Sequence, residues 1–505
     1  MSKLLSKSLI EKLDTKKLWF FRFKKLDDET ILITNDIWAY SYLTNDEFKD
    51  FIVWWETLSE EKKSELSFKK FFKDTSYYES DFKYEYGTKN SFLAFWPILH
   101  IMIITLRCNH KCKYCHAAAA PMTAKELDMT EEIAKKTIDT MFFSTSPEIT
   151  IEFQWWEPLV NWSVIKYSVE YANKKAKELW KKVNFCLVTN LSLMTEDKLE
   201  YLLENEVDIS TSLDWTEEVH NYNRTYKEWN SYENVIKWIE KINARYKTIC
   251  SDMNLWFEKK MGAMLTVTKK TLENYKEVID CYIENGMDWI FIRPLNPYGF
   301  AAADLKKLWY TTEEFLDYYR KSMDYIIEVN KNWKLLREHF SSIYLWKIMR
   351  PRDPNFLDDR SPCGASIWQV AYNFDGKIYT CDEWRMLWRM WIDEFQIWEV
   401  WENTQEVYEN MITSDNTNIM VQSSTLDWMP GYNDSVYKPY IWLCPIHNFK
   451  HRDTVYPNYS LDPKKQISYW VIDYLFKKMK DPEVKEIFKK WVREPDRAVW
   501  KCDVI

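Results

Sequence analysis

Six strand-like segments alternate with helix-like segments between residues 98 and 297, and this alternation restricts the fold more than any other feature. The strand-like segments are 100–108, 148–154, 184–190, 207–214, 262–268 and 288–295. The helix-like segments between them are 130–143, 164–179, 196–205, 231–246 and 272–285. This alternation predicts a parallel sheet covered by helices, either open or curled into a partial barrel. Ligands of such sheets bind at the carboxyl ends of the strands.

The flanking regions predict smaller units around this sheet. Residues 1–95 predict a small α+β module, with a hairpin over 30–43 and a helix over 44–58 behind a Thr/Asn cap. The expected domains after the barrel region (96–300) are a helical connector (301–350), an irregular cysteine-bearing domain (351–470) and a helical tail (471–505). The predicted fold class is therefore α/β, a partial (β/α)6 barrel with an α+β N-terminal module and an irregular C-terminal domain.

Bulk properties exclude several classes of protein. The chain carries 69 basic and 77 acidic residues, a net charge of −8, which gives no electrostatic footprint for nucleic acid. No run of 18 apolar residues predicts a membrane span, and the first 17 residues lack a signal-peptide core. Ten cysteines in 505 residues are too sparse for a secreted disulfide scaffold. We expect a cytoplasmic protein in which clustered cysteines indicate metal binding or catalysis.

Glycine is rare in this chain and tryptophan is abundant. There are 7 glycines and 28 tryptophans. Together they make 35 residues, close to the share of about 7% that glycine alone usually has. Several tryptophans also stand where glycine is expected, such as Trp38 and Trp215 in turns and Trp180 and Trp333 just after helices. The adjacent Trp155 and Trp156 follow a strand, where backbone must approach a ligand.

We therefore hypothesise that many of these tryptophans are glycines in the living organism. The cause would be a UGA codon that the host reads as glycine and a translation table reads as tryptophan. Trp238 and Trp491, inside amphipathic helices, are expected to be genuine tryptophans. The alternative is an unusual, Trp-rich protein.

Three cysteines follow the first predicted strand with the spacing C-x3-C-x2-C. They are Cys108, Cys112 and Cys115, on a loop at the ligand-binding edge of the sheet. Three thiolates on one short loop can hold three irons of a [4Fe–4S] cluster and leave the fourth iron open. The alternative is a Cys3His zinc site that uses His116.

With Trp155 and Trp156 taken as glycine, the strand ends complete a set of motifs that resembles the radical S-adenosylmethionine superfamily. The second strand ends in Gly-Gly-Glu-Pro, the third in VTN, and the fourth in TSLDG followed by HNYNR. This resemblance implies that Cys108, Cys112 and Cys115 bind a [4Fe–4S] cluster. Its open iron would hold S-adenosylmethionine, whose reductive cleavage gives a 5′-deoxyadenosyl radical that abstracts hydrogen from a substrate. The implied cofactor-binding residues are Tyr114, Trp155, Trp156, Glu157, Asn190, Ser212, Asp214 and Arg224.

A second group of cysteines resembles the start of a SPASM-type auxiliary-cluster domain. Cys363 and Cys381 lie in a C-x12-G-x4-C pattern, and Cys444 follows later. Other cysteines of that pattern are replaced by Tyr432, Ser435 and Ile441. The resemblance implies at most one auxiliary cluster, held by Cys363, Cys381 and Cys444. The alternative is three buried free thiols.

Within the superfamily, the chain resembles the radical maturase of the His-Xaa-Ser peptide system. The similar segments include TLRCNHKCKYCHA, FIRPLNPYGFA, RSPCGAS and YTCDEWRM, the last with Trp384 taken as glycine. This implies an enzyme that modifies side chains of a ribosomally made peptide, with a one-electron donor such as flavodoxin or ferredoxin and with a second maturase as a further candidate partner. The N-terminal module becomes a candidate for peptide or partner recognition. The alternatives are a sulfatase-type maturase that oxidises Ser or Cys, and a non-catalytic Fe–S or zinc protein if Trp155 and Trp156 are real.

Overall fold

The computed structural model describes most of the chain, and the statements below concern those residues. They are 16–53, 57–73, 78–94, 97–227, 230–255, 258–296, 298–303, 305–350, 353–354 and 360–492. A search of these residues finds no helix that is both long and apolar enough to cross a membrane.

All six predicted strands are present and lie parallel in one sheet. They are β4 (Leu99–Met102), β6 (Glu148–Phe153), β7 (Lys182–Val188), β8 (Val207–Ser212), β10 (Ala263–Thr266) and β11 (Trp289–Arg293). Neighbours in the sheet follow the order β11-β10-β8-β7-β6-β4. The predicted α/β class and strand-helix alternation are therefore confirmed.

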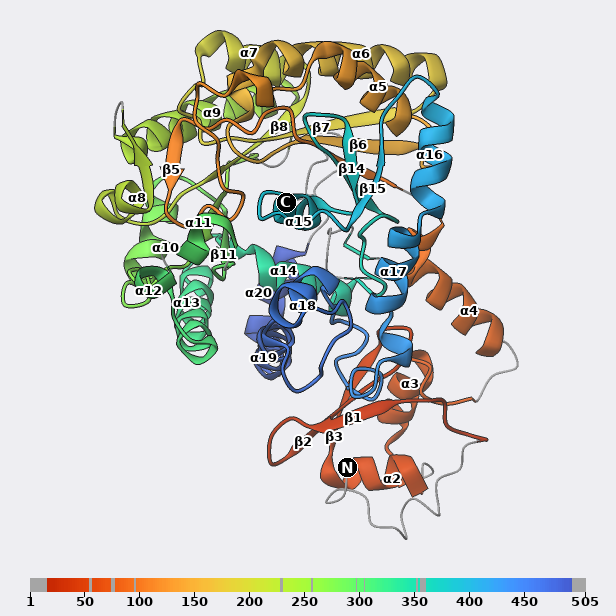
Figure 1. Cartoon of the computed structure of the whole chain (residues 1–505). Helices are drawn as coiled ribbons and strands as arrows, with labels where there is room; N and C mark the ends of the chain where they lie inside the picture. Colours follow the sequence, from red (N-terminus) through yellow and green to blue (C-terminus); the bar gives the residue numbers. More distant parts are fainter. Residues whose placement is uncertain are drawn as a thin grey trace.

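Helices follow these strands and cover the outer face of the curved sheet (Figure 1). They are α5 (Glu131–Met141), α6 (Trp162–Leu179), α7 (Glu196–Glu204), α8 (Glu217–Asn223), α9 (Ser231–Asp252) and α10 (Tyr275–Glu284). Short helices α11 (Gly299–Ala303) and α12 (Leu305–Leu308) follow β11. The apolar stripes of the longer helices and the strands between them form one continuous core.

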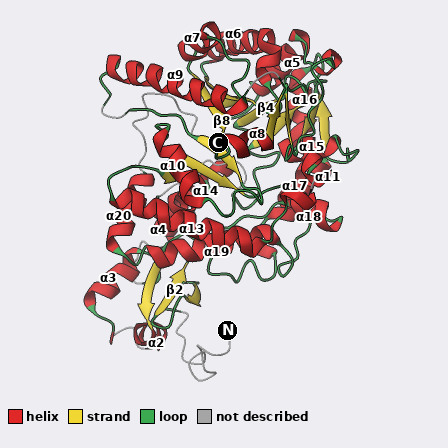
Figure 2. Ribbon diagram, turned by 90° about the vertical axis from the view of Figure 1, so that its left-hand side faces the viewer, coloured by secondary structure: helices red, strands yellow, loops and turns green. Residues whose placement is uncertain are grey.

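The cysteine-bearing C-terminal region is joined to the same sheet, which the sequence did not indicate. Strand β13 (Gln369–Tyr372) pairs in parallel with β4 at the barrel edge. It continues through the antiparallel strands β14 (Lys377–Tyr379) and β15 (Gln396–Glu399). At the opposite edge, β12 (Arg337–Glu338) pairs with β11. One ten-stranded sheet therefore connects the barrel with the C-terminal region. Figure 2 shows strands β4 and β8 of this sheet among the surrounding helices.

The connector and much of the C-terminal region are helical. The connector contains α13 (Thr312–Lys331) and α14 (His339–Met349). The C-terminal region adds α15 (Asp382–Trp388), α16 (Thr404–Thr413), α17 (Asp415–Ser424), α18 (Pro445–Arg452), α19 (Pro463–Lys478) and α20 (Pro482–Trp491). α15 lies on the inner side of the curved sheet, opposite α6 and α7 (Figure 1).

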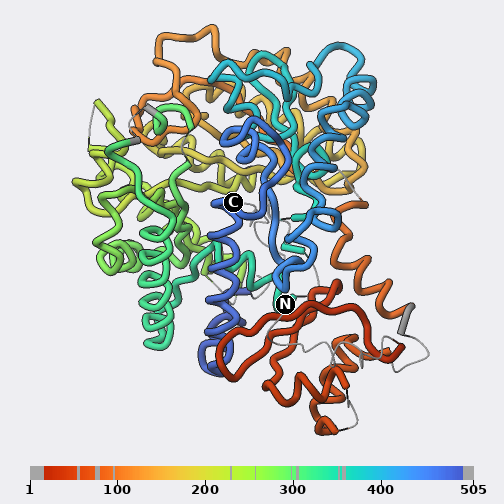
Figure 3. Tube along the Cα trace, turned by 60° about the horizontal axis from the view of Figure 1, so that its bottom comes forward, coloured from red at the N-terminus to blue at the C-terminus, as the bar shows by residue number. Residues whose placement is uncertain are grey.

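The N-terminal module is a small unit with its own core. Its antiparallel sheet contains β1 (Arg22–Lys25), β2 (Thr30–Thr34) and β3 (Tyr40–Thr44). Three helices follow: α2 (Asn45–Val53), α3 (Glu60–Phe68) and α4 (Tyr78–Lys89). The module is seated against α19 (Figure 3), where the Tyr42 hydroxyl donates to the Phe476 carbonyl at 2.8 Å. The predicted hairpin and helix are both present.

Tryptophan adopts the left-handed backbone conformation at six described positions. These are Trp38, Trp155, Trp156, Trp180, Trp333 and Trp391, with φ between 56° and 72°. Of the six positions where the sequence suggested glycine, all except Trp215 therefore adopt the backbone conformation that glycine favours. In the predicted turn at Trp215, the left-handed residue is instead its neighbour Thr216.

Candidate active site

The described residues enclose a cavity of about 260 Å³ at the carboxyl ends of the barrel strands. Its walls come from the loop after β4, from the ends of β6, β7, β8, β10 and β11, and from the C-terminal region. Of the predicted site residues, Cys108, Cys112, Tyr114, Cys115, Trp155, Trp156, Asn190, Ser212 and Arg224 line it. The C-terminal region contributes Asp382, Glu383, Trp442, Lys464, Ile467 and Ser468. One site therefore joins the two cysteine-bearing regions.

The loop after β4 places all three thiols of the C-x3-C-x2-C motif on this cavity. Part of the loop forms β5 (His110–Cys112), which pairs with β9 (Arg224–Tyr226) and sets Arg224 opposite Cys112. The backbone N–H of His110 donates to the Cys108 sulfur at 3.4 Å. Burial raises the pKa of each of the three thiols. Three buried sulfurs on one loop suit an iron–sulfur cluster, which binds them as thiolates.

Gly299, the first residue of α11, lets this helix pack closely against the cysteine loop. Gly299 has φ +54, and a Cβ there would lie 2.4 Å from the His116 carbonyl oxygen. The next residue, Phe300, donates its N–H to the Cys115 carbonyl at 2.8 Å. Close backbone approach therefore fixes the end of the cysteine loop.

Glu157 lies behind the cavity wall and holds the end of β7. It is completely buried, and its carboxylate accepts from Thr189 Oγ1 at 2.7 Å and from the Asn190 N–H at 2.8 Å. Burial raises the pKa of Glu157 to about 7. Whether it also contacts a cofactor amino group, as the sequence predicts, stays a prediction.

Asp214 also lies behind the wall, where it positions two residues that line the cavity. Its Oδ2 accepts from the Tyr114 hydroxyl at 2.7 Å and lies 3.6 Å from Nε of Arg224. The Arg224 guanidinium stands 5.3 Å from the centre of the Tyr114 ring. Burial raises the pKa of Asp214, and Arg224 opposes that rise. A fully buried carboxyl thus orients Tyr114 and Arg224.

A directional chain of hydrogen bonds connects Asp214 to the cysteine loop. The Asp214 N–H donates to Nδ1 of His220 at 3.2 Å, so this nitrogen carries a lone pair. Burial lowers the pKa of both His220 and His110, so each ring is neutral. His220 Nε2–H then donates to Ser231 Oγ, which has one proton left for Nε2 of His110, both at 2.9 Å.

The chain continues to Cys108. With its Nε2 accepting, His110 carries its proton on Nδ1 and donates to Asn109 Oδ1 at 3.2 Å. Asn109 Oδ1 also accepts from Nδ2 of Asn190 at 3.0 Å, and the same Nδ2 lies 3.8 Å from the Cys108 sulfur. Sequence reasoning did not single out this network, although LRCNH and HNYNR both contain its histidines.

Trp155 and Trp156 occupy the cavity with their indole rings. Their φ values are 72° and 57°, and the Nε1 of each ring is buried without a hydrogen-bond partner in the described structure. The Trp155 ring meets the His116 ring edge-on at 4.7 Å. The cavity that remains is smaller than the ~300–1,000 Å³ usual for ligand sites. The thiols therefore fit a cluster, whereas the two indoles do not fit a cofactor beside it.

Polar residues that the sequence analysis missed form the other half of the cavity. Glu152 is 1% exposed and its Oε2 has no described hydrogen-bond partner. Burial raises the pKa of Glu152 to about 8, and that of Glu383 also to about 8. Arg293, Asp382 and Lys464 complete this half. A charged residue inside the otherwise apolar run EITIEF was the available signal for Glu152.

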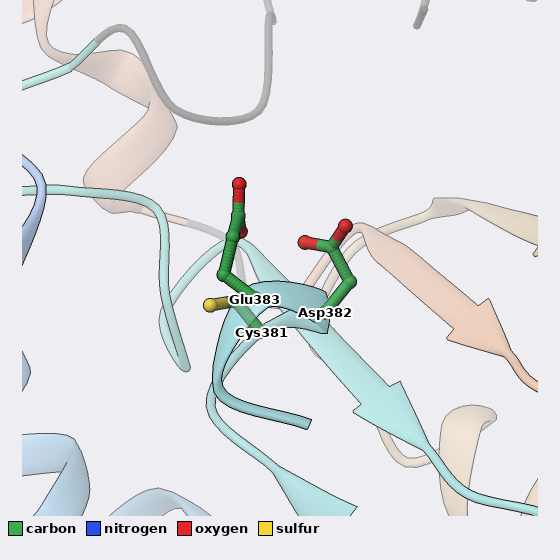
Figure 4. Close-up of side chains that lie close together, drawn as sticks. All are labelled: Cys381, Asp382 and Glu383. Atoms are coloured by element: carbon green, nitrogen blue, oxygen red, sulfur yellow. The ribbon is translucent and has the colours of Figure 1, made fainter. Parts of the chain in front are cut away.

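Cys363, Cys381 and Cys444 are all buried in one small hydrophobic cluster, which is compatible both with the predicted auxiliary site and with the alternative of buried free thiols. Cys381 directly precedes Asp382 and Glu383, and ligand atoms of these three residues lie within 4.8 Å of one another. Figure 4 shows the sulfur pointing to one side of the helix start while the two carboxyl groups rise from it. Trp384 fills part of the same cluster, with its ring centre 3.3 Å from that of Phe395.

Comparison with known proteins finds a match to one superfamily. Residues 102–258 match the model of the Radical SAM superfamily. This part of the chain, from the end of β4 to just beyond α9, is therefore similar to radical SAM domains, and the similarity supports an enzyme.

Individual relatives are distant. The chain is 28% identical over 153 residues to the radical SAM cyclopropyl synthase TigE of Paramaledivibacter caminithermalis, covering 28% of this chain and 31% of TigE. It is 23% identical over 309 residues to a cysteine-type anaerobic sulfatase-maturating enzyme of Clostridium perfringens, covering 55% and 74%. The chain spans less than two thirds of the first two curated relatives, 62% and 31% of their lengths.

A solved structure confirms the fold. Native anSMEcpe with bound AdoMet aligns with 78% of this chain and 100% of its own, with a TM-score of 0.61 and 15% identity. The same protein has been solved with AdoMet and a Cp18Cys peptide.

Proposed function

We propose that the protein is a radical S-adenosylmethionine maturase that modifies side chains of a ribosomally made peptide. The observation that carries this proposal is the single cavity shared by Cys108, Cys112 and Cys115 with Asp382 and Glu383 of the C-terminal region. A peptide side chain at the C-terminal half would stand next to the cysteine loop. The sulfatase-maturating relative and the peptide-bound anSMEcpe structure support a polypeptide substrate.

Cys108, Cys112 and Cys115 would hold a [4Fe–4S] cluster, with S-adenosylmethionine beside Tyr114, Asn190, Ser212 and Arg224. When bound, the two groups supply a 5′-deoxyadenosyl radical. The chain itself orients this site: Asp214 fixes Tyr114 and Arg224, while Glu157 fixes Thr189 and Asn190. Residues of the C-terminal region form one wall of the same cavity.

We also propose that positions 155 and 156 are glycine in the functional protein, through a UGA codon read as glycine. Three observations support this. Both residues adopt φ values that tryptophan disfavours. Both indole N–H groups are buried and unpaired. Elsewhere, Trp180, Trp333 and Trp391 share the left-handed conformation while being 94%, 88% and 97% exposed, so no packing of their rings accounts for it.

The auxiliary site is proposed to hold one cluster at most. Cys363, Cys381 and Cys444 share a buried cluster, and Tyr432 and Ile441 are buried side chains at positions where a second cluster would need cysteines. The Tyr432 hydroxyl donates to Asp462 at 2.8 Å, so this side chain has a hydrogen-bonding role of its own.

The substrate is proposed to be a His-Xaa-Ser type peptide, with the N-terminal module as its recognition unit and a flavodoxin or ferredoxin as electron donor. A sulfatase-type maturase is the second candidate, favoured by the Clostridium perfringens relative. Incubation with a His-Xaa-Ser peptide and with a Cys-containing sulfatase peptide separates the two, because each candidate modifies one of them.

The first experiment is mass spectrometry of the native protein over residues 153–162. Glycine at 155 and 156 supports a working cofactor site, and tryptophan at both overturns the recoding proposal. The second uses protein made with glycine at these positions. Cys112→Ala should abolish iron binding and S-adenosylmethionine cleavage, while Cys250→Ala, at a buried free thiol on α9, should leave both intact. Cleavage that survives Cys112→Ala would overturn the proposed function.

A further inference from the structure

Arg385 carries a charge to which the described residues offer no hydrogen bond. Its side chain is completely buried on α15, and none of its three side-chain nitrogens has a hydrogen-bond partner in the described structure. The guanidinium lies 4.2 Å from the centre of the Trp156 ring. Asp382, Tyr379 and Asp375 act on the charge through their electrostatic field, and Arg389 opposes them.

The Trp156 ring alone does not compensate for the burial of the Arg385 charge. Burying an unpaired ion is strongly unfavourable, and a cation–π contact offsets only part of that cost. Burial accordingly lowers the pKa of Arg385 to about 9. Guanidinium groups keep their proton in proteins, so the charge needs an anion.

The ring in contact with Arg385 also lines the cavity. Trp156 is a cavity residue, and so is Asp382, at the start of the helix that carries Arg385. When position 156 is glycine, the indole is gone and the space that it fills connects the guanidinium with the cavity. The five donors of an arginine fork then match the two oxygens of a carboxylate.

The rest of this half of the cavity tolerates an anion. Burial raises the pKa of Glu152 to about 8, so this carboxyl group is largely neutral at pH 7. Arg293 and Lys464 are basic residues of the same lining, and together with Arg385 they outnumber the acidic Asp382 and Glu383. The local balance of charge is therefore positive.

We propose that Arg385 is a carboxylate-binding residue of the active-site cavity, opened by glycine at position 156. The carboxylate belongs either to the peptide substrate or to the methionine part of S-adenosylmethionine. The inference rests on the proposed function for the presence of these ligands and on glycine at 156 for access.

Chemical modification of arginine tests whether the Arg385 side chain is accessible from the cavity, and it does not require enzymatic turnover. In protein with glycine at 155 and 156, phenylglyoxal should modify Arg385, as mapped by mass spectrometry, at least tenfold faster than in protein with tryptophan at both. Arg320, exposed on α13, should react equally in the two proteins and serves as the internal control. Equal protection of Arg385 in both proteins would overturn the proposal.

Ligands that slow the modification of Arg385 show which carboxylate it binds. If S-adenosylmethionine slows the reaction with phenylglyoxal and its decarboxylated form does not, the carboxylate is that of the cofactor. Slowing by glutarate in the presence of saturating S-adenosylmethionine indicates the substrate side. If no carboxylate slows the reaction, the proposal is wrong. S-adenosylmethionine cleavage is measured separately on the same glycine protein, so its failure is recognised as a failure of the proposed function.

A stability measurement gives an independent check. Arg385→Met should raise the Tm of the apoprotein, because it removes an unpaired buried charge and keeps the apolar stem. Arg360→Met, which breaks the buried pair with Asp353 at 2.6 Å, should lower it. A lower Tm for Arg385→Met would mean that the guanidinium has a structural partner, and would contradict the proposal.

Discussion

Arg224 lies directly opposite Cys112 in the β5–β9 ladder, and its Nε lies 3.6 Å from the buried carboxylate of Asp214. One cation therefore stands between a predicted cluster ligand and the carboxyl group that orients Tyr114. Both strands are only three residues long. Their pairing places the charged residue Arg224, on β9, against the cysteine loop.

Replacing Arg224 with an uncharged residue should destabilise the protein. Arg224→Gln leaves Asp214 buried without an opposite charge, so the unfolding free energy of the apoprotein should fall by about 3–5 kcal/mol. Asp214→Asn in the same protein should recover part of this loss, because no charge then remains unpaired. Urea denaturation of the two single variants and the double variant measures the coupling. Strictly additive losses would contradict a direct interaction.

Position 180 tests the glycine hypothesis away from the active site. Trp180 ends α6 in the left-handed conformation and is almost fully exposed, so its ring contributes little to packing. Trp180→Gly should stabilise the protein by about 1–2 kcal/mol, since the left-handed region costs that much for a side chain with Cβ. Trp238→Gly, at a buried position inside α9, should instead cost more than about 3 kcal/mol. If both substitutions destabilise alike, residue 180 has no preference for glycine.

The sequence predicted the barrel because each of its strands carries a local apolar signal next to a helical one. Asn190 and Ser212 could be placed at the cavity because they end such strands. The pairing of Gln369 with Leu99 had no local signal, since it joins segments far apart in the chain. Asp382 and Arg385 were missed for the same reason, because their approach to the cavity depends on how α15 lies against the sheet. The left-handed turns were predictable at Trp38 and Trp180, where strand and helix boundaries fix the backbone.

Ser231 should matter more than its small side chain suggests. Ser231→Ala leaves the Nε2–H of His220 and the Nε2 of His110 without partners, at a cost of about 2–4 kcal/mol. Helix capping is unaffected, because Asn230 is the N-cap of α9. Ser251→Ala, exposed on the same helix, is the matched control. Ser231→Thr should restore most of the stability and the iron content after reconstitution. Full stability of the alanine variant would show that the chain of hydrogen bonds is not formed.

Glu152 should make the stability of the apoprotein depend on pH in a defined direction. Its pKa is raised by burial from 4.5 to about 8, so the folded state holds a proton that the unfolded state has lost. The stability contribution of the protonated form is complete below pH 4.5 and is lost as pH rises through 8. Glu152→Gln removes this loss, so the variant should exceed the unmodified protein in stability by a few kcal/mol above pH 8, with the gap closing toward pH 4.5. Glu240→Gln, exposed on α9, should show no such divergence. Denaturant titrations at pH 5, 7 and 9 measure both differences, and a gap that widens toward low pH would mean that Glu152 is charged and paired in the folded protein.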